Sequence, residues 1–117
     1  MFQVTDEGMI YLSRGDTCTI TLAVLSGNNM CNYLYPLEEG DKIYFGLTEP
    51  NQRFEDAILK KVYTKEDVDE DGNVEIKFNP TDTEYLKEQM YFYTIKLSNQ
   101  DQTRVETLID KKRFFIV

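Results

Sequence analysis

The chain has 117 residues, a length that suits one domain and is too short for two. Its hydrophobic content of 41%, with 8 Tyr and 7 Phe, is enough for a packed interior. The net charge of −8 and a single short basic run, residues 111–113, tell against nucleic acid as a partner. No stretch approaches the roughly 18 apolar residues of a membrane helix, and the start does not resemble a signal peptide. We predict one domain over residues 1–117, with no nucleic-acid or membrane contact.

The chain lacks histidine, and its two cysteines, Cys18 and Cys31, do not form a Cys-x-x-Cys pair. These features exclude an ordinary zinc site. A turn near residues 27–29 does not place the two cysteines symmetrically, so we predict two free thiols, as expected for folding in a reducing cytoplasm. There is no Gly-rich phosphate loop, nucleophile elbow or histidine base, so we predict no catalytic residues, no enzyme activity and no cofactor.

Alternation of apolar and polar residues with period two predicts an all-β fold. In the first half of the chain the predicted strands cover residues 9–12, 17–25, 32–35 and 42–48. The clearest half-buried strand is residues 17–25, where one face carries Cys18, Ile20, Leu22 and Val24. Gly46 interrupts the opposite face of the strand at 42–48, which indicates a bulge or close packing.

In the second half the predicted strands cover residues 57–63, 74–78, 91–97, 104–109 and 114–117. The segment 57–63 also fits the start of a helix, but its short length between turn signals favours a strand. One helical turn near residues 81–87, capped by Thr81 or Asp82, is expected to cross between sheets. A total of about eight or nine antiparallel strands at this spacing is typical of an immunoglobulin-like β-sandwich.

The segment 65–73 is acidic and is predicted to be an exposed loop. Its alternating carboxylates followed by Gly72 resemble the start of a calcium loop. However, the twelfth position is Phe78 in place of a bidentate carboxylate, and strands replace the flanking helices. We favour a solvated hairpin tip and keep weak calcium binding as the alternative, for which the metal candidates are Asp67, Asp69 and Asp71.

Residues 14–16 spell Arg-Gly-Asp, an integrin-ligand tripeptide, but they lie where two strands need a turn, and we interpret them as that turn. Tyrosines on the predicted strands, Tyr11 among them, are a better indication of a contact surface, because tyrosine is enriched at protein interfaces. Most are expected in the core or on a sheet face. The interface candidates are Tyr33, Tyr35, Tyr44, Tyr91 and Tyr93.

Several segments occur in a characteristic order: residues 12–17, 37–45, 80–83 with Leu86, 91–97, and 105–109 with Phe114 and Ile116. From about Gly8 to Val117 this series resembles the immunoglobulin-like N-terminal domain of phage baseplate upper proteins. The resemblance implies a structural domain of a tailed-phage or prophage virion, in the baseplate, tail or other host-adsorption apparatus. It implies no enzyme activity and no cofactor. It also implies that the chain folds in the bacterial host cytoplasm and is then incorporated into the virion.

We therefore expect a virion structural or assembly module whose partners are other virion proteins, with self-association as a further option. The alternative from another class is a carbohydrate- or calcium-binding accessory module. Its candidate residues are Tyr33 and Tyr35 for a glycan and the acidic loop for calcium.

Overall fold

The protein is described by a computed structural model that covers residues 2–23, 39–70, 72–99 and 105–117. Within these residues the chain forms eight strands, the short helix α1 (Pro80–Thr83) and the 3-10 turns η1 (Phe54–Asp56) and η2 (Lys65–Asp67). The strands are β1 (Phe2–Val4), β2 (Ile10–Leu12), β3 (Cys18–Ala23), β4 (Lys42–Thr48), β5 (Leu59–Thr64), β6 (Asn73–Phe78), β7 (Met90–Ser98) and β8 (Val105–Ile116). The prediction of an all-β fold is confirmed.

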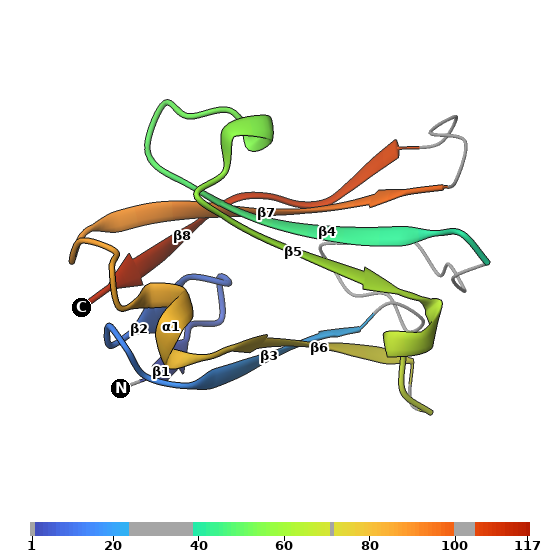
Figure 1. The fold of residues 1–117 in the computed structure, drawn as a ribbon, viewed down its shortest axis with the longest axis horizontal. Helices are drawn as coiled ribbons and strands as arrows, with labels where there is room; N and C mark the ends of the chain where they lie inside the picture. The colour runs from blue at the N-terminus through green and yellow to red at the C-terminus, as the bar shows by residue number, and fades with distance from the viewer. Residues whose placement is uncertain (1, 24–38, 71, 100–104) are drawn as a thin grey trace.

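The described strands form two sheets. One has six strands in the order β1-β2-β8-β7-β4-β5, and the other pairs β3 with β6. Figure 1 shows the β3–β6 pair lying opposite β4, β5 and β7, while β1 and β2 curl toward the layer of the small sheet. The strand pairs are antiparallel with one exception: β2 and β8 run parallel, with Ile10 beside Phe114. The expectation of purely antiparallel pairing was wrong at this place, because the first and last parts of the chain meet across a long connection.

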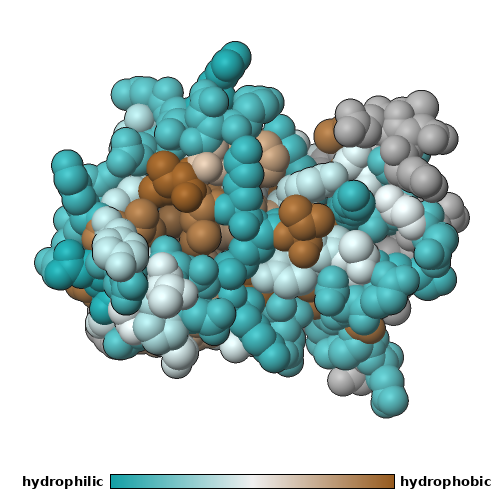
Figure 2. Space-filling model, in the orientation of Figure 1, coloured by the Kyte–Doolittle hydropathy of each residue, from teal (hydrophilic) through white to brown (hydrophobic). Residues whose placement is uncertain are grey.

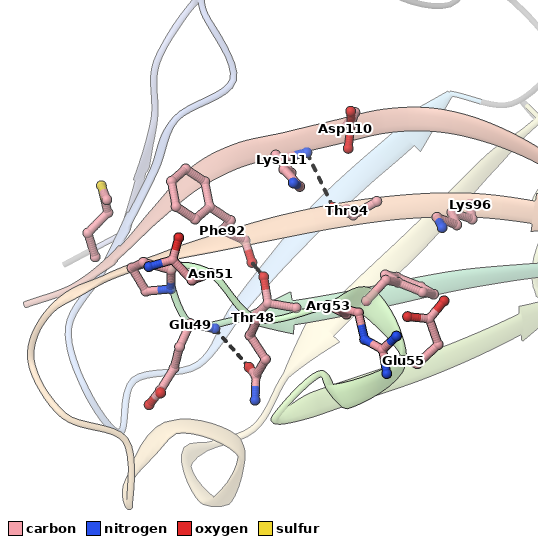
Figure 3. Close-up of a pocket in the computed structure, with 14 residues that line it drawn as sticks. Thr48, Glu49, Asn51, Arg53, Glu55, Phe92, Thr94, Lys96, Asp110 and Lys111 are labelled. Atoms are coloured by element: carbon pink, nitrogen blue, oxygen red, sulfur yellow. Dashed lines mark hydrogen bonds between the residues drawn. The ribbon is translucent and has the colours of Figure 1, made fainter.

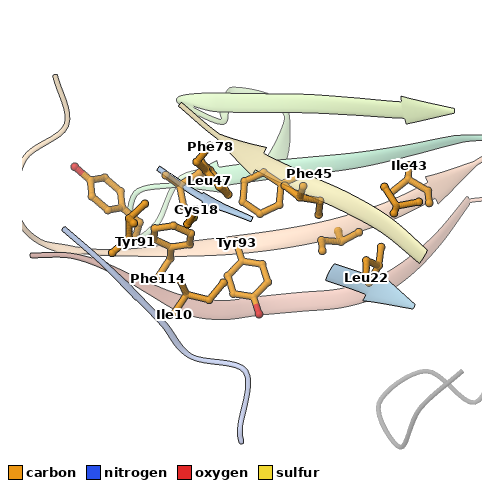
Figure 4. Packing of buried hydrophobic residues seen from close by; sticks show 14 of the residues in the cluster. Ile10, Cys18, Leu22, Ile43, Phe45, Leu47, Phe78, Tyr91, Tyr93 and Phe114 are labelled. Atoms are coloured by element: carbon orange, nitrogen blue, oxygen red, sulfur yellow. The ribbon is translucent and has the colours of Figure 1, made fainter. Parts of the chain in front are cut away.

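The core lies between the two sheets and is built from the inward half of each alternating strand. On β4 these residues are Ile43, Phe45 and Leu47. The Phe45 ring meets the Phe78 ring edge-on at 5.4 Å between centroids and stacks at 5.9 Å on the Tyr93 ring. Figure 4 shows these rings from β4, β6 and β7 gathered with Phe114 of β8. Period-two alternation therefore predicted the buried faces correctly.

Two strand predictions differ from the structure at the ends of the chain. The predicted strands 104–109 and 114–117 are one strand, β8, and the basic run at 111–113 lies inside it. Lys111 has φ 48, in the left-handed region, and the β7–β8 register shifts between Tyr93 and Lys96, so a bulge takes the place of the break expected between the two predicted strands. Strand β1 was missed because it has only three residues, too few for an alternating pattern to be distinguished from chance, and all three are exposed. The predicted strand at 32–35 lies outside the described residues.

The helical turn predicted near 81–87 is α1, which starts at Pro80 and already ends at Thr83, and the prediction of Thr81 or Asp82 as its cap was wrong. Its cap is Asn79, whose backbone N–H donates to Asp82 Oδ2 at 2.8 Å in a capping box. The same carboxylate oxygen lies 3.0 Å from Lys61 Nζ. This ion pair ties β5 of the large sheet to the segment that connects β6 with β7.

Candidate functional site

The outer face of the six-stranded sheet, the face turned away from β3 and β6, carries a row of apolar side chains. The register aligns Tyr11 of β2, Phe115 of β8 and Met90 of β7. The Tyr11 and Phe115 rings are stacked, with centroids 4.6 Å apart and planes 7° from parallel. All three side chains are only partly buried. This "aromatic row" is hydrophobic surface that the core does not use.

A second row lies one step further along the strands. Phe92 of β7 is half-buried and pairs with Arg113 of β8 on one side and Thr48 of β4 on the other. Arg113 is exposed, and so is Glu49, which follows Thr48. A tight turn holds Glu49, since its N–H donates to Gln52 Oε1 at 2.9 Å and its carbonyl accepts from the Gln52 N–H at 3.0 Å. An aromatic side chain therefore lies between a cation and an anion.

The loop at residues 49–57, which contains η1, folds over β4. A Cβ atom on Gly46 would lie 2.6 Å from Phe54 Cε2, so only glycine permits the Phe54 ring to sit there. Lys96 Nζ lies 4.6 Å from the centroid of the same ring, in a cation–π contact. Lys60 Nζ donates to the Glu55 carbonyl at 2.7 Å. The prediction of close packing at Gly46 is confirmed. The loop that packs there makes the β4 side of the outer face stand higher than the β8 side.

A groove of about 670 Å³ runs along β7 between this loop and β8. Its floor comes from the outward residues of β7, and its second wall from the bulge at Asp110 and Lys111, where the Lys111 N–H donates to Thr94 Oγ1 at 3.2 Å. Figure 3 shows Asp110 and Lys111 on the β8 side of β7, with Glu49 and Arg53 on the opposite side. The charged lining residues are Glu49, Arg53, Glu55, Lys96, Asp110 and Lys111. The groove is thus balanced in charge on a chain whose net charge is −8.

The predicted interface tyrosines fall into three groups. Tyr44 lies on the outer face, half-buried between Val62 and Lys96 in the register. Tyr91 and Tyr93 are 1% and 4% exposed, so the prediction that they form an exposed interface is wrong. Their hydroxyls donate to the carbonyls of Lys87 (3.0 Å) and Gly8 (2.7 Å), and burial raises the pKa of Tyr93 to about 12. Tyr33 and Tyr35 lie outside the described residues.

Sequence reasoning missed the residues that do lie on the outer face, namely Met90, Phe92 and Phe115. In the run Tyr91-Phe92-Tyr93 every residue is aromatic, so alternation does not say which side chains face the core. The usable signal was the phase of the neighbouring apolar residues Ile95 and Leu97, which place Phe92 on the other face.

The acidic segment connects β5 of the large sheet to β6 of the small sheet, and these two strands do not pair, so the prediction of a hairpin tip between them was wrong. Within the segment an isolated antiparallel bridge joins Val68 and Val74. Asp67 Oδ2 accepts from the Thr64 N–H at 2.8 Å, and Asp69 Oδ1 accepts from the Asn73 N–H at 2.9 Å. Both carboxylates therefore serve as local caps beside a hollow of about 360 Å³. Among the described residues, no three Cys, Asp or Glu side chains gather as a metal site. The third candidate, Asp71, lies outside them, and weak calcium binding stays an untested alternative.

The remaining sequence features have structural roles. The Arg-Gly-Asp segment is the predicted turn: Gly15 has φ 81, and the Asp16 N–H donates to the Ser13 carbonyl at 3.0 Å. Cys18 is a buried free thiol whose pKa is raised to about 11, mainly by burial and further by the nearby Asp82 carboxylate. Cys31 lies outside the described residues. No helix within the described part of the chain is long and apolar enough to span a membrane.

Comparison with protein-family models, with curated proteins and with solved structures found no match to the chain in any of the three. The functional proposal below is therefore argued from the surface of the domain itself.

Proposed function

We propose that the chain is an immunoglobulin-like structural module of a tailed-phage or prophage virion, and that it acts in the baseplate, tail or other host-adsorption apparatus through contacts with other virion proteins. The order of the sequence segments quoted above supports the family. Two sheets enclosing one core are compatible with such a sandwich. The observation that supports a role in assembly is the aromatic row on the outer face.

The chemistry of the aromatic row suits a contact surface. The core is already filled by the inward residues of the same strands, so the stacked rings of Tyr11 and Phe115 are not needed for it. Partly exposed aromatic and Met side chains are enriched at protein interfaces, where they offer a large contact area at low entropic cost. Arg113 and Glu49 supply the polar rim that such patches usually have.

The free edge of β5 is a weaker surface for assembly. Ile58 and Val62 are 39% and 50% exposed there, but the exposed Lys60 stands between them. Lysines on an edge strand discourage strand pairing. In the view of Figure 2, hydrophobic atoms form separate brown areas divided by polar side chains. The outer face is therefore the surface that the described geometry favours, and no described residue favours the carbohydrate alternative, whose tyrosines lie outside the described part of the chain.

The test is incorporation into particles of the encoding phage. Mass spectrometry of purified virions is expected to detect the chain, and Tyr11→Gln is expected to lower its incorporation by about fivefold or more, the effect of losing one aromatic anchor. Thr19→Gln, an exposed change on β3, is the matched control and should incorporate normally. Circular dichroism melts of both variants verify folding. Absence of the chain from virions, or normal incorporation of folded Tyr11→Gln, would contradict the proposal.

A further inference from the structure

Strand β5 differs from its neighbour β4 in how it meets the small sheet. The inward residues of β4, such as Phe45, are almost fully buried and pack on other apolar side chains. The inward residues of β5 are Leu59, Lys61 and Tyr63, and all three are only partly buried. Figure 1 shows β5 at the edge of the large sheet, slanting from β4 toward η2 and the small sheet. The contact of β5 with the small sheet is therefore less apolar than that of β4.

Lys61 joins β5 to the segment that follows β6. Its ammonium group lies 3.0 Å from Asp82 Oδ2 and 5.4 Å from the centroid of the Phe78 ring. The same Asp82 oxygen accepts from the Asn79 N–H at 2.8 Å, which fixes the carboxylate at the start of α1. Both side chains of the ion pair are 18% exposed, so solvent screens the pair only in part. We call this contact the Lys61–Asp82 clasp.

Tyr63 makes a second polar contact between β5 and the small sheet. It lines the hollow of about 360 Å³ together with Lys77 of β6. Burial raises the pKa of Tyr63, and a hydrogen bond from the Lys77 backbone partly offsets this rise. Polar contacts exchange with water at little net cost, whereas the rings around Phe45 lose buried apolar contact if the sheets separate. The β5 side of the sandwich is thus held more weakly than the centre.

The position of β5 in the sheet adds to this difference. Among the described strands β5 is hydrogen-bonded to β4 alone, whereas β4 and β7 each have a partner on both sides. Elements with few buried apolar contacts and a free edge are those that open locally while the rest of a domain stays folded. When the clasp opens, Lys61 gains water and Asp82 keeps its Asn79 N–H donor, so neither charge is left buried without a partner.

We propose that β5 is a strap that opens from the small sheet while the rest of the domain stays folded, and that the Lys61–Asp82 clasp holds it closed. In the open state the edge of β4 has lost its partner strand. Water then reaches the core at Phe78 and at Cys18, the residue that pairs with Phe78 in the small sheet. The strap is a property of the fold, and the inference does not depend on the proposed function.

Amide hydrogen exchange under native conditions, followed by NMR, tests this strap because it resolves local from global opening. In the wild-type chain the β5 amides bonded to β4 are expected to exchange at least about tenfold faster than those of β7. Asp82→Asn removes the ion pair and retains an oxygen that accepts from the Asn79 N–H. It should accelerate exchange by about tenfold in β5 and by the same factor in β7, because the clasp is broken in the locally open state and in the unfolded state alike.

Two further variants complete the design. Lys61→Met removes the charge but keeps an aliphatic side chain on Phe78, and it should accelerate exchange in the same two strands. The matched control is Asp56→Asn, the same substitution in the ion pair with Arg53, where the two side chains are 57% and 80% exposed. Exposed pairs of this kind contribute little, so exchange in β5 and β7 should stay unchanged.

Three results would overturn the strap. Wild-type β5 amides that exchange no faster than those of β7 would mean that β5 opens only when the whole domain unfolds. Acceleration by Asp82→Asn in β7 alone, or in neither strand, would mean that the clasp does not hold β5 closed. Equal acceleration by Asp56→Asn would assign the effect to net charge. None of these results alters incorporation of the chain into particles, so the proposed function is tested separately.

Discussion

The inner and outer faces of the six-stranded sheet are made by the same strands but follow different rules. Inward residues such as Phe45 and Ile95 are almost fully buried and meet the second sheet. Outward residues such as Phe92 and Phe115 are apolar as well, yet they stay partly exposed. Packing in the core accounts for the apolar character of the inward residues, but it does not account for that of the outward residues. The difference teaches that alternation identifies a fold, while apolar residues out of phase with it identify surface available for contact.

The largest effect that separates the two faces is the loss of a core ring. Phe45→Ala removes contacts with Phe78 and Tyr93 and should lower the free energy of unfolding by about 3–5 kcal/mol. Phe115→Ala on the outer face should cost only about 1–2 kcal/mol, because the ring is half-exposed from the start. Guanidinium unfolding of both variants measures the difference. Equal costs would mean that the outer ring belongs to the core.

The buried thiol on the inner side gives a pH-dependent effect. The pKa of Cys18 is raised from 9.0 to about 11, so the unfolded chain loses this proton first as the pH rises. The contribution of the thiol is fully present below about pH 9 and is lost between about pH 9 and pH 11, up to about 2–3 kcal/mol. Unfolding of the wild type and of Cys18→Ala at several pH values gives the difference. Parallel curves for the two proteins across this window would contradict the buried position of the thiol.

Substitution of Gly46 tests whether the contact with Phe54 fixes the loop at residues 49–57 on the outer face. Gly46→Ala puts a methyl group against the Phe54 ring and should cost about 1–3 kcal/mol. In a Phe54→Ala background the same change should cost much less, because the obstructing ring is gone. Thermal unfolding of the four proteins in this cycle measures the coupling. An unchanged cost in the Phe54→Ala background would show that the ring does not cover Gly46.

Much of the fold could be predicted from the sequence, because burial on one face imposes a period of two that Val74, Ile76 and Phe78 display without ambiguity. What could not be predicted depends on contacts distant in sequence. The cover over Gly46 comes from Phe54, eight positions later in a polar loop, and the parallel pairing of Ile10 with Phe114 joins opposite ends of the chain. The outer-face residues were missed because the all-aromatic run shows its phase only through the neighbouring Ile95 and Leu97, and alternation does not say which apolar outward residues serve for contact.

The smallest expected effect concerns the acidic segment, which belongs to neither face. Asp67 and Asp69 already accept backbone N–H groups, and their hydrogen bonds hold the turns of this connection. Calorimetric titration with calcium up to about 5 mM should therefore give no saturable heat, since a weak site would begin to fill in this range. A saturable signal that disappears in Asp69→Asn would restore the calcium interpretation.

Hydroxyl-radical footprinting of the chain, free and within purified particles, tests the role of the outer face most directly. Tyr11, Met90 and Phe92 are expected to be oxidised in the free chain and protected in the particle. Tyr85, which is 88% exposed and lies beyond α1, provides the internal reference and should react alike in both. Protection of the outer-face residues is the predicted result, and equal oxidation of them in the free and assembled states would contradict the account.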